Sequence, residues 1–126
     1  MAATLIFSPT QVTALLVNRA ERVLAKVSAD ILAYSVNSFS LPKTGKMHGR
    51  HQASAPGEPP AIDTGTLQGS GGFRKIGPLK YEVYFSVKYA RDLELGTRNI
   101  APRPFVAPAF EAHKRPFEQA MQQIFR

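Results

Sequence analysis

The chain has 126 residues, no cysteine, and a formal net charge of +7 from sixteen Lys and Arg against nine Asp and Glu. One domain of this length buries about two thirds of the surface of its unfolded chain. The composition excludes disulfides and thiolate-bound metals, and no stretch approaches the ~20 apolar residues of a membrane helix or the core of a signal peptide, so we expect a soluble, uncleaved chain with no membrane partner.

The first predicted element is a long amphipathic helix at residues 9–37. Ser8 is expected to be its N-cap, with Pro9 at the first helical position and Gln11 reaching back to the Ser8 amide. Apolar residues recur along it at intervals of three and four: Val12, Leu16, Ala20, Val23, Val27, Ile31 and Tyr34. At ~1.5 Å per residue this helix is about 40 Å long, so part of it is expected to pack on a neighbouring protein unless it lies wholly across its own sheet.

Residues 38–62 are predicted to form a long loop. Gly, Pro, Ser, His and Lys are dense there, and no hydrophobic period persists. A structureless segment of this length is uncommon inside a compact domain, so we expect this assembly loop to be ordered by a partner rather than in the free subunit.

The remaining residues, 63–126, are predicted to form an α+β core. Asp63 is expected to cap a short helical turn. A β-hairpin is predicted from residues 73–76 and 79–88, because apolar and polar side chains alternate along the second strand and a Gly-Pro pair separates the two.

A short helix or tight bend is predicted after the hairpin, since Tyr89 and Leu93 lie four residues apart and Gly96 can end a helix in the left-handed conformation. Residues 98–105 should be extended, because their two prolines fix φ and remove amide donors.

A closing helix is predicted from about Ala107, with Pro116 producing either a kink or two consecutive helical pieces. The expected fold is therefore a single α+β domain over residues 1–126. It has a small antiparallel sheet flanked by a long N-terminal helix and a C-terminal helix, with a long central loop.

Catalytic and metal chemistry find little support. His48 and His51 lie close together, but with His113 they are the only histidines, and no further ligands surround them as a zinc or nuclease site requires. Glu82, Asp92 and Glu94 have no adjacent nucleophile, so surface or ion-pair roles are favoured over acid–base catalysis. We expect no enzyme activity, metal or cofactor.

Three segments together resemble the head–tail joining and tail-completion proteins of siphophages. They are His-Gln-Ala-Ser-Ala-Pro-Gly-Glu-Pro-Pro-Ala-Ile-Asp-Thr-Gly-Thr-Leu at residues 51–67, Tyr-Ala followed by Leu-Glu-Leu-Gly-Thr within residues 89–97, and Pro-Arg-Pro-Phe followed by Pro-Ala within residues 102–109. The resemblance covers the chain from roughly Gly45 onwards. Its short motifs are individually weak but jointly fairly specific.

The resemblance implies a structural virion protein of a long-tailed bacteriophage, assembled in the host cytoplasm and located in the neck or tail. Such a subunit forms a ring with copies of itself, here expected to be a hexamer, and joins the tail to the head around the DNA channel. Its other partners would be neck, tail-terminator or tail-tube proteins.

The resemblance also marks a set of motif or subunit-interface residues. Asp63, Thr64 and Gly65 would cap and turn the chain, while Glu94 is expected to pair with Arg103 beside a bend. The full set is His51, Pro56, Gly57, Glu58, Asp63, Thr64, Gly65, Tyr89, Glu94, Gly96, Thr97, Arg103 and Phe105. The chain departs from the pattern of the family at two places. Arg91 and Asp92 are charged where the family is more apolar, and Pro116 interrupts the predicted last helix.

The positive charge leaves a second interpretation open, a basic nucleic-acid-binding module that does not read base sequence. Lys43, Lys46, Arg50 and His51 lie in a flexible loop that can neutralise phosphates, and the first three would be the DNA contacts in a phage channel. The loop lacks interleaved aromatic residues, and an ordinary solvated basic surface explains the scattered charges equally well. A small hydrolase, the third possibility, has no supporting set of residues.

Overall fold

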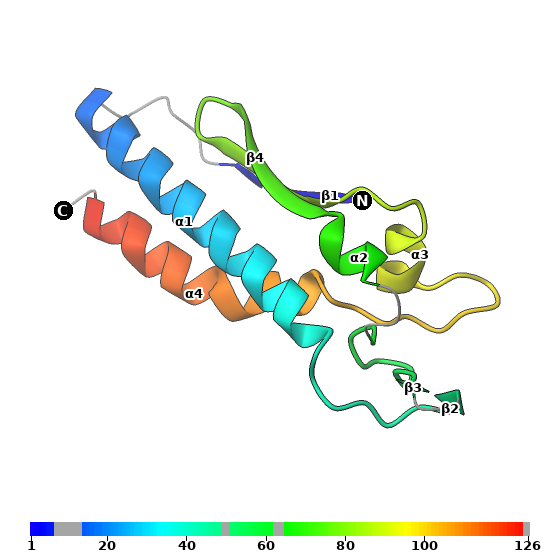
Figure 1. Ribbon diagram of the computed structural model, residues 1–126. Helices are drawn as coiled ribbons and strands as arrows, with labels where there is room; N and C mark the ends of the chain where they lie inside the picture. Colours follow the sequence, from blue (N-terminus) through cyan, green and yellow to red (C-terminus); the bar gives the residue numbers. More distant parts are fainter. Residues whose placement is uncertain (7–13, 49–50, 62–64, 125–126) are drawn as a thin grey trace.

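The fold is α+β, as predicted. The computed structural model describes residues 1–6, 14–48, 51–61 and 65–124. A three-stranded antiparallel sheet of order β1-β5-β4 lies on the long helix α1, which also packs along the C-terminal helix α4 (Figure 1). The principal elements are β1 (Ala2–Ile6), α1 (Ala14–Ser38), β4 (Gly71–Gly77), β5 (Lys80–Phe85) and α4 (Ala107–Ile124).

Four short elements lie at one end of the molecule, away from the C-terminus (Figure 1). They are β2 (Met47–His48), β3 (His51–Gln52), α2 (Thr66–Gly69) and α3 (Ala90–Leu95). The two short strands pair with each other and make a small hairpin within the central loop, which the sequence did not predict. The short helix predicted after the main hairpin is confirmed as α3.

The β4–β5 hairpin is confirmed, but its turn lies at Pro78 and Leu79 rather than at Gly77 and Pro78, and β5 ends at Phe85 rather than continuing to residue 88. Leu79 is fully buried and has φ of 52°, an unusual conformation for a residue other than glycine. The sequence did not predict β1, which pairs antiparallel with β5 from Ala2 opposite Tyr84 to Ile6 opposite Lys80. This third strand makes β5 the centre of the sheet.

The buried residues of α1 are Ala20, Leu24, Ser28, Ile31, Ser35 and Ser38, and the predicted apolar residues Val23 and Val27 are partly buried and pack against the core. The Ser28 hydroxyl donates to the Leu24 carbonyl at 2.7 Å, so a small polar side chain is buried with its donor satisfied by its own helix. The prediction that Tyr34 lies on the packed face is wrong, since Tyr34 is 45% exposed and its ring meets His113 edge-on at 5.7 Å. The predicted cap at Ser8, Pro9 and Gln11 lies outside the described residues.

Helix α4 runs without interruption through Pro116, so the alternative of two consecutive helical pieces is wrong. Pro116 has no amide hydrogen, so the Ala112 carbonyl lacks its helical donor. Both residues are exposed, so water can donate to this carbonyl instead. Among the helices in the described part of the chain, none is both long enough and apolar enough to cross a membrane.

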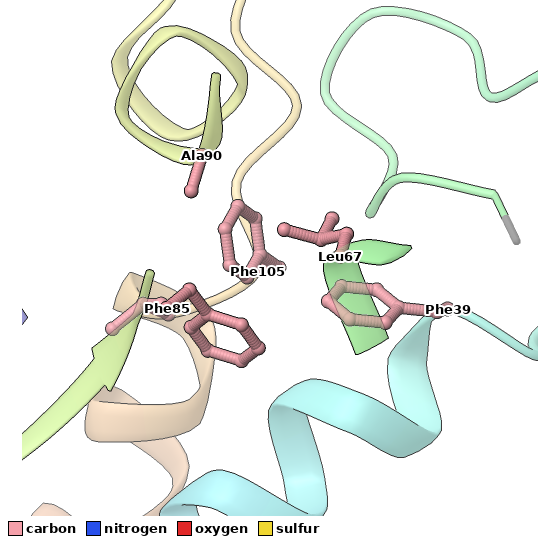
Figure 2. Close-up of a cluster of buried hydrophobic side chains, with 6 residues drawn as sticks. Phe39, Leu67, Phe85, Ala90 and Phe105 are labelled. Carbon is pink, nitrogen blue, oxygen red and sulfur yellow. The ribbon is translucent and has the colours of Figure 1, made fainter. Parts of the chain in front are cut away.

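Three phenylalanine rings form the centre of the core at the end that carries α2 and α3. Phe39, Phe85 and Phe105 meet edge to face, with centroids 5.0–6.0 Å apart, and Leu67 and Ala90 pack against them (Figure 2). Because each residue comes from a different segment, this phenylalanine cluster fixes the end of α1, α2, β5, α3 and the chain before α4 relative to one another.

Candidate functional site

A pocket of about 490 Å³ lies beside the phenylalanine cluster. Its walls come from the central loop, α2, the start and middle of α3, and the chain that follows α3. The lining residues used below are Ser54, Gly65, Leu67, Tyr89, Ile100 and Arg103. Three of the motif residues, Gly65, Tyr89 and Arg103, thus come from separate segments and line one pocket. The sequence did not predict that Ser54, Leu67 and Ile100 contribute to this site. For Ile100 the only indication in the sequence was an apolar residue within an otherwise polar turn.

Arg103 is held in place by its backbone. It lies between two prolines, and its amide donates to the Leu93 carbonyl at 2.6 Å. Its half-buried side chain donates from Nε to the Ser54 carbonyl and from Nη1 to the Ala101 carbonyl, both at 3.4 Å. These contacts are long for hydrogen bonds, and both acceptors are uncharged.

Glu94 does not pair with Arg103, so that prediction is wrong. The Glu94 carboxylate is buried and accepts hydrogen bonds from the amides of Phe105 at 2.7 Å, Val106 at 3.0 Å and Ala107 at 2.8 Å. These amides lie at the N-terminus of α4, where backbone donors lack helical partners and the helix dipole favours a negative charge. Glu94 of α3 therefore caps α4 from eleven or more residues away, which no local spacing predicted.

Gly96 and Thr97 shape the bend between α3 and Arg103. Gly96 ends α3, as predicted, but with φ of 73° and ψ of 169° it lies outside the left-handed helical conformation that was expected, and a Cβ there would lie 2.8 Å from the Ile100 carbonyl oxygen. The Thr97 amide donates to Ile100 at 2.8 Å and its hydroxyl accepts from the Asn99 amide at 3.3 Å. Residues 98–100 therefore turn, and the prediction of an extended segment from residue 98 is wrong for them because this hydrogen-bonded turn intervenes.

The described part of the central loop contains a hydrogen-bonded turn and the short β2–β3 hairpin, neither of which the sequence predicted. Pro56 and Gly57 are the central residues of a turn closed by the Glu58 amide on the Ala55 carbonyl at 3.0 Å, and Gly57 has φ of 85°, which suits a type II turn. The Gly57 amide donates to the Pro102 carbonyl at 2.9 Å and so ties the loop to the chain beside Arg103.

Glu58 organises this loop. One of its carboxylate oxygens accepts from the Ala55 amide at 2.7 Å, the Thr44 amide at 3.0 Å and the Thr44 hydroxyl at 2.9 Å. The hydrogen bonds from the Ala55 and Thr44 amides lower the pKa of Glu58. This motif residue therefore closes its own loop rather than presenting a free charge.

Of the predicted DNA contacts, the structure describes Lys43 and Lys46. The Lys43 side chain is buried, and its ammonium donates to the Ser38 carbonyl at the end of α1 at 2.6 Å, so it caps a helix instead of facing a phosphate. Burial lowers the pKa of Lys43, and nearby Glu58 partly offsets that effect. Lys46 is exposed, whereas Arg50 lies outside the described residues.

The other motif residues have structural placements or lie outside the description. His51 begins β3, and Phe105 is buried in the phenylalanine cluster. Asp63 and Thr64, the predicted cap and turn, lie outside the described residues, and Gly65, with φ of 79°, occupies the N-cap position of α2.

The described residues contain no group of three His, Asp or Glu side chains placed to hold a metal. Two of the carboxylates considered for acid–base chemistry have other partners. Glu82 contacts Arg74 at 3.4 Å, and Glu94 accepts hydrogen bonds from backbone amides. The pocket at this end of the molecule has Arg103 as its one charged lining residue among those described.

Comparison of the chain with family models, with curated proteins and with solved structures finds no match. The motif resemblance and the pocket are the observations on which a function is proposed.

Proposed function

We propose that this chain is a structural virion protein of a long-tailed bacteriophage, a neck or tail-completion subunit that acts as one copy in a ring at the head–tail junction. The observation that carries the proposal is the convergence of the motif residues. Gly57 bonds to the chain beside Arg103, Glu94 caps the helix after it, and Tyr89, Gly65 and Arg103 line one pocket. Motif residues that shape a single surface are expected where a loop-built surface docks a partner.

The surface at this end is suited to protein contact. Tyr89 is 45% exposed, Ile100 43% and Leu95 62%. Exposed aromatic and aliphatic side chains grouped beside a pocket favour association with another protein, and tyrosine and arginine are enriched at such interfaces.

A nucleic-acid-binding module is the second candidate, favoured by the solvent side of α1. Arg19, Arg22 and Lys26 are exposed and recur at intervals of three and four, so they lie along one side of the helix. Lys26 is paired with Asp30 at 2.9 Å, which leaves two arginines for phosphates. In a ring subunit the same side of α1 would suit the wall of a DNA channel.

The test is deletion of the gene from the genome that encodes it, followed by electron microscopy of lysates and mass spectrometry of purified particles. The expected result is separate filled heads and tails, restored to joined particles by the wild-type gene, with the chain present in the restored particles. Normal yields of infectious particles without the chain would overturn the proposal. Salt-dependent binding of duplex DNA by the isolated chain, together with normal particles, would instead favour the second candidate.

A further inference from the structure

The pocket beside the phenylalanine cluster carries one charge. Of the described residues that line it, Arg103 alone is charged, and its neighbours Leu67, Leu93, Ile100 and Tyr89 offer apolar surface. The volume of about 490 Å³ lies within the range of pockets that enclose a ligand or a few side chains.

The described residues use only part of the hydrogen-bonding capacity of Arg103. A guanidinium carries five N–H donors in a planar fork, whereas the structure gives this one two contacts of 3.4 Å, to the carbonyls of Ser54 and Ala101. Among the described residues no carboxylate forms an ion pair with it. Its main chain is fixed by two prolines and the bond to Leu93, so the side chain starts from a defined place at the pocket, and its planar fork can bind a bidentate acceptor.

The two motif carboxylates that the structure describes, Glu58 and Glu94, are already engaged. Glu94 accepts from three amides at the start of α4, and Glu58 accepts from three donors within its own loop. Moving Glu94 toward Arg103 would leave the buried amides of Phe105 and Val106 without an acceptor, and moving Glu58 would break the hydrogen bonds that close its loop. Neither of these two carboxylates is therefore free to neutralise Arg103, and an acceptor on a partner molecule would complement its charge.

We propose that this pocket receives a peptide segment of a partner protein in which one Asp or Glu is flanked by apolar side chains. The carboxylate pairs with the Arg103 guanidinium, while the flanking side chains lie against Leu67, Tyr89 and Ile100. The inference rests on the proposed function in that the partner is a neighbouring protein of the neck or tail, and it adds the chemistry that this neighbour must present.

The probe is a short peptide, blocked at both ends, with one glutamate between leucines, and its matched control has glutamine in place of the glutamate. Both are titrated into the full ¹⁵N-labelled chain and followed by NMR. The glutamate peptide is expected to shift the amides of Leu67, Tyr89 and Ile100 and to bind about tenfold more tightly than the glutamine peptide, the difference that one charge-assisted bidentate pair supplies.

The variant Arg103→Gln should bind both peptides equally, because it keeps a hydrogen-bonding side chain and removes the charge. Arg103→Lys keeps the charge without the fork and should retain only part of the difference. Arg98→Gln is the control, since Arg98 is an exposed residue of the neighbouring turn and does not line the pocket. This variant should keep the full preference for glutamate.

Equal affinities of the two peptides for the wild-type chain, or no shifts at the pocket at millimolar peptide, would overturn the inference. So would displacement of the peptide by a duplex DNA oligonucleotide, or a self-association contact that shifts the same amides without any peptide. The titrations use the isolated chain, so their failure leaves the virion experiment standing. Normal particles without the chain would refute the proposed function and leave a measured glutamate preference intact.

Discussion

At the scale of single residues, Glu94 shows how one buried charge joins two elements. Its side chain belongs to α3, yet its acceptor oxygens satisfy amides at the start of α4. The charge lies where the helix dipole is positive, and burial keeps water from competing for the same amides. Glu94 therefore fixes the segment that carries Arg103 by holding the chain immediately after it.

Replacing Glu94 by glutamine should lower the free energy of unfolding by about 2–3 kcal/mol, because an amide NH₂ would face backbone N–H donors and the charge-assisted bonds would be lost. Urea unfolding at neutral pH measures the change. Glu118→Gln on the exposed side of α4 is the control and should change the free energy of unfolding by less than about 0.5 kcal/mol. Equal stability of the two variants would contradict the capping role of Glu94.

At the scale of elements, the β4–β5 hairpin is attached to α1 by Glu21. Its carboxylate accepts from the Leu79 amide in the hairpin turn at 3.0 Å and lies 2.8 Å from the Lys75 ammonium. Burial alone would raise the pKa of Glu21, but the hydrogen bond from Lys75 and the Leu79 amide outweigh it, so the pKa is lowered. The turn with its positive φ at Leu79 is thus held by a partner on the helix.

A lowered pKa in the folded state predicts a pH dependence with a definite sign. The Glu21 carboxylate contributes stability above the ordinary value of 4.5, and this contribution is lost as the pH falls from that value through the lower folded pKa. Glu21→Gln should therefore be less stable at neutral pH and lose less stability over this acid interval. Thermal unfolding across the interval measures it, with Glu111→Gln on α4 as an exposed control. Parallel pH profiles for wild type and Glu21→Gln would refute the role of Glu21.

At the scale of the whole molecule, the central loop is attached to the body at several points. Lys43 bonds to the end of α1, Gly57 to Pro102, and Arg103 to Ser54. The loop therefore forms one wall of the pocket in the single chain. Its further ordering between subunits of a ring stays a prediction.

The loop amides that have partners should be protected from hydrogen exchange in the isolated subunit. Gly45 donates to Ala53 at 3.0 Å and Gly57 to Pro102 at 2.9 Å, so both should exchange well below the rate of an unfolded peptide. Hydrogen exchange followed by NMR measures it. The control is the Thr44 amide in Glu58→Gln, which should exchange faster than in wild type because its acceptor loses its charge. Unprotected exchange throughout residues 43–57 would show that the contacts do not persist in the free chain.

The sequence by itself determined the elements whose signals are local. The three- and four-residue period predicted α1, strict alternation predicted β5, and Gly96 marked the end of α3 because glycine readily adopts the positive φ found there. These features depend on neighbours a few residues away, so the α+β class followed from them.

The tertiary structure alone decided which partner each polar side chain takes. Glu94 was expected beside Arg103 but meets amides of the following helix, Lys43 was expected on a DNA-facing surface but caps α1, and Tyr34 was expected in the core but lies at its edge. The strand β1 forms only because β5 presents it an edge. The spacing of apolar residues along the sequence indicates which face of a helix or strand is buried. Whether a carboxylate meets the amides of a distant segment depends instead on how several segments pack around the phenylalanine cluster.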